Sequence, residues 1–303
     1  MNYDLIRRKL AVGETIILDG GTGTDIQRRG APMSGVTWCA DANATHLDIV
    51  QAAHEDYIRA GADVVTANTF ASSALSFNCY GRDADLLELD RLAVSAARAA
   101  AKGHDISVAG SVSTMRPVIA GTDRTDLSVN WTKAEAQALF VRKIDNLKAC
   151  GVDFIIMEMM RDADYSAWAC EVAMTAGLPV WIGISVERRS DRALSGFGRS
   201  DQLLKDFAPV LATFKPEVMC IMHSSPEDTT DAIDVLHQSW NGPLGAYPEC
   251  GYFKSPDWVF TDISPNDLVT SATEWQKHGV SIFGGCCGIG PDHIQALKQE
   301  FAP

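Results

Sequence analysis

The sequence has no run of about 20 consecutive apolar residues, the length that a membrane-spanning helix needs. Residues 1–14 lack the apolar stretch and the cleavage site of a signal peptide. Positive charge is also scarce: the formal net charge is -13, which disfavours binding to nucleic acid or to an anionic membrane surface. We therefore expect a cytoplasmic protein that acts on small molecules, with no nucleic-acid or membrane partner.

A dinucleotide-binding fingerprint is missing as well. Residues 20–25, GGTGTD, follow the first predicted strand but do not match the pattern G-x-G-x-x-G. No acidic residue stands at the end of a clear second strand, where it would bind a ribose. This absence disfavours a doubly wound open sheet, which is the main alternative fold.

What the sequence does contain is an alternation of short β-branched or aromatic runs with longer segments of helical period. We predict strands at residues 15–20, 62–68, 106–112, 153–159, 179–186, 217–223, 243–248 and 280–285. Eight such strand and helix units close a barrel. We therefore predict an α/β fold with a single (β/α)8 TIM-barrel domain over residues 1–303. The long connections 20–45, 113–131 and 249–263 should form its active-site face.

Residues 284–288, GGCCG, carry the strongest local signal for chemistry. Neighbouring side chains on a strand point to opposite faces, so Cys286 and Cys287 can direct both sulfurs to one point only where the backbone turns, as flanking glycines permit. Cys220 ends another predicted strand and would project from the same face of a barrel. Three thiolates and one open position are typical of a catalytic zinc ion.

Other interpretations of these residues stay open. The vicinal cysteines could be incidental to a glycine-rich turn, or they could form a reversible disulfide in a redox sensor. Without the other two cysteines, Cys220 would be interpreted as a buried cysteine within a strand. His223 could replace one cysteine as a ligand, but strand alternation points it away from Cys220, so we expect it beside the metal or the substrate.

Four segments resemble the ordered motifs of the homocysteine S-methyltransferase family: residues 19–30 (DGGTGTDIQRRG), 61–70 (GADVVTANTF), 151–158 (GVDFIIME) and 284–294 (GGCCGIGPDHI). The resemblance extends from residue 15 to residue 298. It implies a (β/α)8 barrel in which Cys220, Cys286 and Cys287 bind Zn²⁺. It also implies a transferase that moves a methyl group from an onium donor, such as S-methylmethionine, S-adenosylmethionine or a betaine, to homocysteine and so makes methionine.

The resemblance further implies that Asp19, Gly20, Thr69 and Glu158 line the amino-acid pocket, with Asp19 and Glu158 as catalytic residues. A zwitterion needs a carboxylate for its ammonium group, and all four residues end predicted strands. Taken without the resemblance, Asp19 could cap the following turn and Glu158 could pair with Arg161.

This chain also departs from the family pattern. Met219 stands where Asn commonly precedes the first zinc cysteine, and Met159 stands where Thr or Tyr commonly follows the pocket glutamate. The donor and the oligomeric state cannot be predicted. Aromatic residues in or beside the long connections favour a cationic donor: Trp38, Trp131, Tyr247, Tyr252, Phe253 and Trp258.

Two other functions compete with methyl transfer. One is hydrolysis by a zinc-bound water, which three thiolates disfavour because their charge leaves the water poorly acidified. The other is a zinc or redox sensor built on Cys286 and Cys287.

Overall fold

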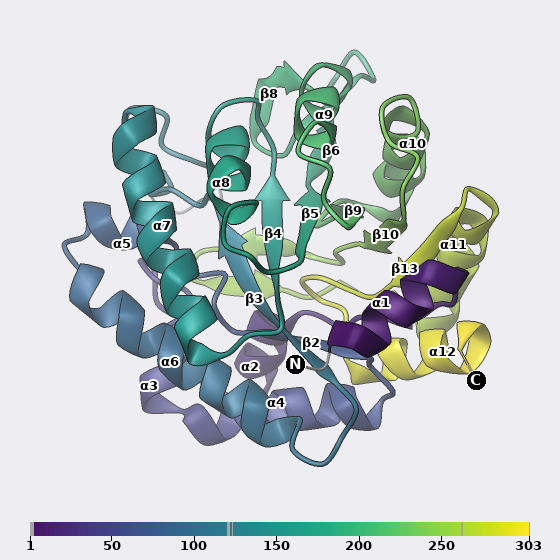
Figure 1. Ribbon diagram of the computed structural model, residues 1–303, viewed down its shortest axis with the longest axis horizontal. Helices are drawn as coiled ribbons and strands as arrows, with labels where there is room; N and C mark the ends of the chain where they lie inside the picture. Colours follow the sequence, from purple (N-terminus) through teal and green to yellow (C-terminus); the bar gives the residue numbers. More distant parts are fainter. Residues whose placement is uncertain (1–2, 120–121, 123, 262, 303) are drawn as a thin grey trace.

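The computed structural model describes residues 3–119, 122, 124–261 and 263–302. In this part of the chain, eight parallel strands form one sheet in the order β1-β13-β10-β9-β5-β4-β3-β2. A parallel bridge between Leu18 and Val64 then joins β1 to β2. The sheet therefore returns to its first strand, and the predicted (β/α)8 barrel is confirmed (Figure 1).

Each of the eight predicted strands overlaps one strand of the barrel. The barrel strands are β1 (Ile16–Ile17), β2 (Val64–Ala67), β3 (Ser107–Ser113), β4 (Phe154–Met160), β5 (Val180–Ile184), β9 (Val218–Met222), β10 (Leu244–Tyr247) and β13 (Val280–Phe283). They are almost wholly buried and rich in β-branched residues, as expected for strands covered on both faces.

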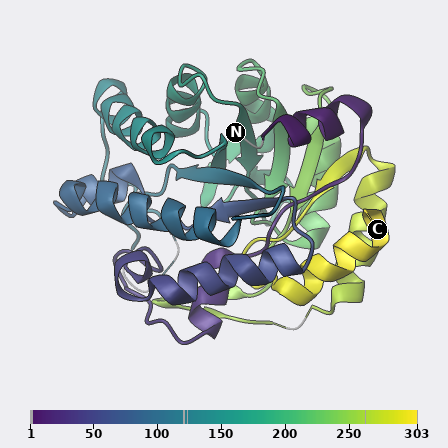
Figure 2. The same ribbon diagram turned by 60° about the horizontal axis from the view of Figure 1, so that its bottom comes forward.

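A closed ring of helices surrounds the strands, because neighbours pack against each other all the way round and the last helix, α12, lies beside α4 (Figure 2). The ring contains α4 (Leu47–Arg59), α6 (Asp83–Ala100), α7 (Lys133–Cys150), α8 (Tyr165–Ala173), α9 (Leu204–Ala212), α10 (Pro226–Leu236), α11 (Pro265–Lys277) and α12 (Pro291–Phe301). Four further helices are α1 (Tyr3–Val12), α2 (Thr22–Arg28), α3 (Ala42–Thr45) and α5 (Ala74–Cys79). None of the helices in the described ranges has the length and apolar character needed to cross a membrane.

Side chains fill the amino-terminal end of the barrel. Tyr3, on α1, accepts a hydrogen bond from the indole of Trp181 at 2.7 Å and donates one to Glu217 at 2.8 Å. The ring of Phe154 lies 4.8 Å from that of Trp181, centroid to centroid. This floor closes the amino-terminal end, and the cavity described below lies at the carboxyl ends of the strands.

Two small antiparallel sheets rise from that carboxyl end. Strands β6 (Val186–Arg188), β7 (Leu194–Gly196) and β8 (Arg199–Leu203) lie between β5 and α9, in a segment where no separate sheet was predicted. Strands β11 (Tyr252–Lys254) and β12 (Asp257–Val259) form a hairpin within the connection 249–263. The hairpin contributes Phe253 and Trp258 to the wall of the cavity described next, and the turn between β7 and β8 contributes Phe197.

Candidate active site

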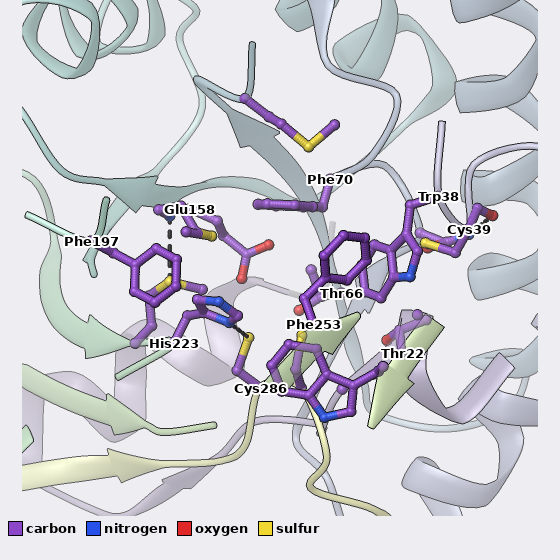
Figure 3. Close-up of a pocket in the computed structure, with 18 of the residues that line it drawn as sticks. Thr22, Trp38, Cys39, Thr66, Phe70, Glu158, Phe197, His223, Phe253 and Cys286 are labelled. Carbon is purple, nitrogen blue, oxygen red and sulfur yellow. Dashed lines mark hydrogen bonds between the residues drawn. The ribbon is translucent and has the colours of Figure 1, made fainter. Parts of the chain in front are cut away.

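A cavity of about 180 Å³ opens at the carboxyl ends of the barrel strands (Figure 3). Five of the predicted site residues line it: Asp19, Gly20, Glu158, Cys286 and Cys287. Cys220 and Thr69 do not form part of this lining. The placement agrees with the rule that barrel enzymes build their sites on this face.

The two adjacent cysteines follow β13 in a turn held by backbone hydrogen bonds. Cys286 N–H donates to the carbonyl of Pro248 at 2.7 Å, and Cys250 N–H donates to the carbonyl of Cys287 at 2.8 Å. Gly288 has φ +86°, and a Cβ there would lie 1.8 Å from the carbonyl oxygen of Cys250. The turn therefore requires glycine at this position, and the turned backbone expected from GGCCG is present.

This turn gathers three groups that can bind a soft metal ion. The ligand atoms of His223, Cys286 and Cys287 all lie within 4.8 Å of one another. His223 Nδ1 is 3.4 Å from Cys286 Sγ, and its Nε2 is 3.0 Å from a carboxylate oxygen of Glu249. A carboxylate on the far nitrogen of a histidine is the usual support of a metal-binding imidazole.

His223 reaches the cysteines because the strand ends before it. Strand β9 stops at Met222, and His223 has φ +43°, a left-handed conformation that non-glycine residues seldom adopt. The alternation that directed its side chain away from Cys220 therefore does not apply to it. The ring instead lies over the cavity beside Cys286 (Figure 3).

Cys220 lies deeper, in the middle of β9 and not at its end. It pairs in register with Gly183 of β5 and Gly245 of β10, and its side chain packs with the residues that fill the barrel interior. A Cβ on Gly245 would lie 2.5 Å from Cys220 Sγ, so the glycine makes room for this sulfur. Burial, and next the charge of Glu158, raise the pKa of the Cys220 thiol well above its ordinary value.

The thiols of Cys286 and Cys287 shift each other's pKa in opposite directions. A hydrogen bond from Cys287, followed by the neighbouring charge of His223, lowers the pKa of Cys286 well below the ordinary value for a thiol. The same hydrogen bond raises the pKa of Cys287. Thiolate is the form that binds metal ions, and a divalent cation would favour its formation at both sulfurs.

Two buried carboxyl groups face the same cavity. Asp19, after β1, accepts hydrogen bonds from Thr66 N–H at 2.6 Å and from the Thr66 hydroxyl at 3.0 Å. Glu158, on β4, accepts a hydrogen bond from Ser111. Burial raises the pKa of Asp19 to about 7, and burial with the nearby charge of Cys286 raises that of Glu158 to about 8. A bound cation would stabilise the ionised form of both groups.

Thr69 is placed behind the cavity wall. Its hydroxyl donates to the carbonyl of Ser111 at 2.9 Å and accepts from Ser111 N–H at 3.0 Å, and the residue is fully buried. Thr66 lines the cavity instead. The alternation of β2 could have predicted the position of Thr66, because Val64 points into the barrel and Thr66 lies on the same face of the strand.

Aromatic rings form much of the remaining wall. Of those expected from the sequence, Trp38, Tyr247, Phe253 and Trp258 line the cavity, whereas Trp131 and Tyr252 do not. Phe70 and Phe197 were not anticipated, since each comes from a segment whose path depends on the fold (Figure 3). Met159 also lines the cavity, but Met219 is buried among the core residues outside it.

Thiols, carboxyl groups and aromatic rings meeting at the carboxyl end of a TIM barrel are the arrangement of a barrel enzyme. A model of the family described as homocysteine S-methyltransferase matches residues 16–301. The chain belongs to the homocysteine S-methyltransferase family, and it is a methyltransferase.

Individual relatives agree with this membership. The chain is 26% identical over 319 residues to betaine–homocysteine S-methyltransferase 1 of Pongo abelii, with 98% of this chain and 75% of the relative covered. It is 26% identical over 317 residues to S-methylmethionine–homocysteine S-methyltransferase BHMT2 of the same species, with 98% and 81% covered. The crystal structure of the metallated homocysteine methyltransferase MmuM from Escherichia coli shares its fold, with a TM-score of 0.77, 23% identity and 99% of each chain covered.

Proposed function

We propose that this enzyme transfers a methyl group from an onium donor to the thiol of homocysteine and so makes methionine. One observation carries the proposal: two turned cysteines, two buried carboxyl groups and several aromatic rings line a single cavity. The cysteines match the thiol of the acceptor, the carboxyl groups match its ammonium group, and the aromatic rings match the cationic donor. The names of the relatives agree with homocysteine as the acceptor.

The proposed metal is zinc, held by Cys286 and Cys287 with Cys220 as the third ligand. Thiolates and an imidazole are the donors that zinc prefers, so the residues present fit this ion. When bound, zinc would keep the acceptor sulfur in its thiolate form at neutral pH. His223 competes with Cys220 for the third position, because it already lies within 4.8 Å of both turn cysteines.

The chain's own residues bind and orient the two substrates. Glu158 and Asp19 hold the acceptor's ammonium group, and this bound charge favours their ionised forms. Gly20 would contact the acceptor through its backbone, which borders the cavity. Packing requires glycine here, because a Cβ would lie 2.4 Å from the carbonyl oxygen of Ile289. The aromatic rings receive the donor's cationic methyl group.

In the reaction, the acceptor sulfur forms a bond to the methyl carbon as that carbon's bond to the donor sulfur or nitrogen breaks. The electron pair of the broken bond stays with the donor, which leaves as a neutral sulfide or tertiary amine. The thiol proton is released to solvent. Aligning the two substrates for this in-line displacement is the main catalytic contribution of the cavity.

The test is to incubate zinc-loaded protein with homocysteine and single donors, among them betaine, S-methylmethionine and S-adenosylmethionine, and to measure methionine by mass spectrometry. Methionine that depends on enzyme, zinc and donor together supports the proposal. Absence of methionine with every donor, in protein shown to hold zinc, contradicts it. Zinc-free protein that forms a reversible Cys286–Cys287 disulfide would instead support a redox sensor.

A further inference from the structure

Arg116 is a buried cation on the wall of the active-site cavity. It lies in the connection between β3 and α7, and only 3% of it is exposed. The neighbouring residues Met115 and Pro117 line the cavity with it. Charged side chains are seldom this buried unless a partner of opposite charge binds them.

The polar contacts of the Arg116 guanidinium are few and long. One terminal nitrogen donates to the side-chain oxygen of Asn130 at 3.4 Å, and the other lies 4.0 Å from a carboxylate oxygen of Asp162. Its Nε is buried without a hydrogen-bond partner among the residues that the structure describes. The Tyr165 ring lies 4.1 Å from the guanidinium carbon and fixes the position of the group. Most of its five N–H donors remain available to a ligand.

Asp162 makes no hydrogen bond to Arg116, and its two carboxylate oxygens accept from other groups. Arg199 donates to one oxygen at 2.8 Å, and Ser166 N–H donates to the other at 3.0 Å. Asp162 is itself buried, with 1% exposed. The closer guanidinium is thus that of Arg199, which also pairs with Asp201 at 2.8 Å, whereas Arg116 keeps a buried Nε–H that no described residue accepts.

The acidic groups of the cavity occupy a different part of its wall. Asp19 and Glu158 are held by Thr66 and Ser111, which belong to β2 and β3. The contacts of Arg116 come instead from residues outside the strands: Asn130, Asp162 and Tyr165. The cavity therefore presents negative charge near the barrel strands and positive charge in the connections beyond them.

We propose that Arg116 binds the carboxylate of the methyl donor and makes the enzyme selective for onium donors that carry one. This inference rests on the proposed function. The acceptor's carboxylate and ammonium groups are bonded to the same carbon, so both must bind close to Asp19 and Glu158. A donor such as betaine or S-methylmethionine instead carries its carboxylate several bonds away from the reacting methyl group, so this carboxylate can bind elsewhere on the cavity wall. The two parallel N–H groups of a guanidinium bind a carboxylate well.

The experiment compares each carboxylate donor with its methyl ester, which keeps the onium group but loses the negative charge. Zinc-loaded wild type, Arg116→Met, Arg116→Lys and the control Arg98→Met are assayed with S-methylmethionine, betaine and their methyl esters. Arg98 is a suitable control because it pairs with Asp153, away from the cavity. We expect Arg116→Met to raise the KM of both carboxylate donors about tenfold or more, the effect of losing a charge-assisted hydrogen bond.

The KM of the esters and of homocysteine should stay within about twofold of wild type, with Arg116→Lys intermediate for the carboxylate donors. A rise in the homocysteine KM without a rise for the donors would overturn the inference, because the carboxylate would then belong to the acceptor. Equal losses for acid and ester would also overturn it, since Arg116 would only support the wall.

A binding measurement separates this inference from the proposed function. S-methylmethionine and its ester are titrated calorimetrically into acceptor-free, zinc-loaded wild type and Arg116→Met. If wild type makes no methionine, the proposed function fails, yet a preference for the acid that disappears in Arg116→Met still supports the carboxylate site. Equal affinity of wild type for acid and ester refutes the site, whatever the turnover.

Discussion

Nδ1 of His223 lies 3.4 Å from Sγ of Cys286, although the two residues are 63 positions apart in the chain. The contact joins the end of β9 to the turn after β13 across the carboxyl end of the barrel. It forms because each residue stands just beyond its strand, where the backbone can leave the alternating pattern. The cysteines of the turn thereby have an imidazole beside them.

The first prediction separates the two candidate third ligands of the metal. Cys286→Ala and Cys287→Ala should each lose most of the zinc while the barrel stays folded, because the turn lies at the rim and not in the core. Cys220→Ala should also lose most zinc, and His223→Ala should keep it. Metal analysis and circular dichroism provide the measurements, with buried Cys170→Ala on α8 as the control. Full zinc retention in Cys220→Ala, with loss in His223→Ala, would identify His223 as the ligand.

The second prediction concerns acceptor binding by Glu158. Glu158→Gln preserves the shape of the side chain but removes the charge that faces the acceptor's ammonium group, so the homocysteine KM should rise about tenfold or more. Zinc content should not change, because Glu158 is not one of the proposed ligands. Steady-state kinetics with varied homocysteine would measure the effect, and an unchanged acceptor KM would refute the assignment.

The third prediction is a pH dependence that originates at Asp19. Burial raises the pKa of this carboxyl from 3.8 to about 7 in the folded protein. Between these values the folded state keeps a proton that the unfolded state has released, so the free energy of unfolding falls as pH rises, by roughly 4 kcal/mol at most, and levels off above about 7.

Asp19→Asn should remove this contribution. Calorimetric melting of metal-free protein across pH 4 to 8 would compare the two proteins, and the Tm of the variant should fall less with rising pH than that of wild type. Parallel curves for the two proteins would show that Asp19 is not protonated in the folded state.

The fourth prediction tests the backbone of the cysteine turn. Gly288→Ala should destabilise the protein and lower its zinc content, because the added Cβ would lie 1.8 Å from the Cys250 carbonyl oxygen at φ +86°. Gly103→Ala is the matched control: its φ is +84°, but a Cβ there meets nothing within 4 Å. The control should lose only about 1–2 kcal/mol, the cost of a left-handed residue. Equal melting temperatures and zinc contents for the two variants would contradict the steric explanation.

Local patterns in the sequence were sufficient to predict the barrel and the turn that contains Cys286 and Cys287. Alternating strand and helix periods depend on near neighbours, and they located all eight barrel strands. The glycines beside the cysteines are also a local pattern, and they predicted a turned backbone. The structure has this turn, with a positive φ at Gly288. Asp19, Gly20 and Glu158 lie on the cavity because strand ends of a barrel share one face.

The tertiary structure decided which side chains complete the cavity. Breaks in strand geometry at Met159 and His223, both with positive φ, redirect side chains in ways that alternation cannot predict. Phe197 and Arg116 come from connections whose paths depend on packing against distant residues, so no local pattern places them on the wall. Thr66 lines the cavity while Thr69 supports it, because the chain leaves β2 at Ala67 and folds behind it. The sequence by itself therefore determined the barrel and its cysteine turn, because both have local causes. Closure of the barrel decided the composition of the site, because only closure brings residues far apart in the chain into contact.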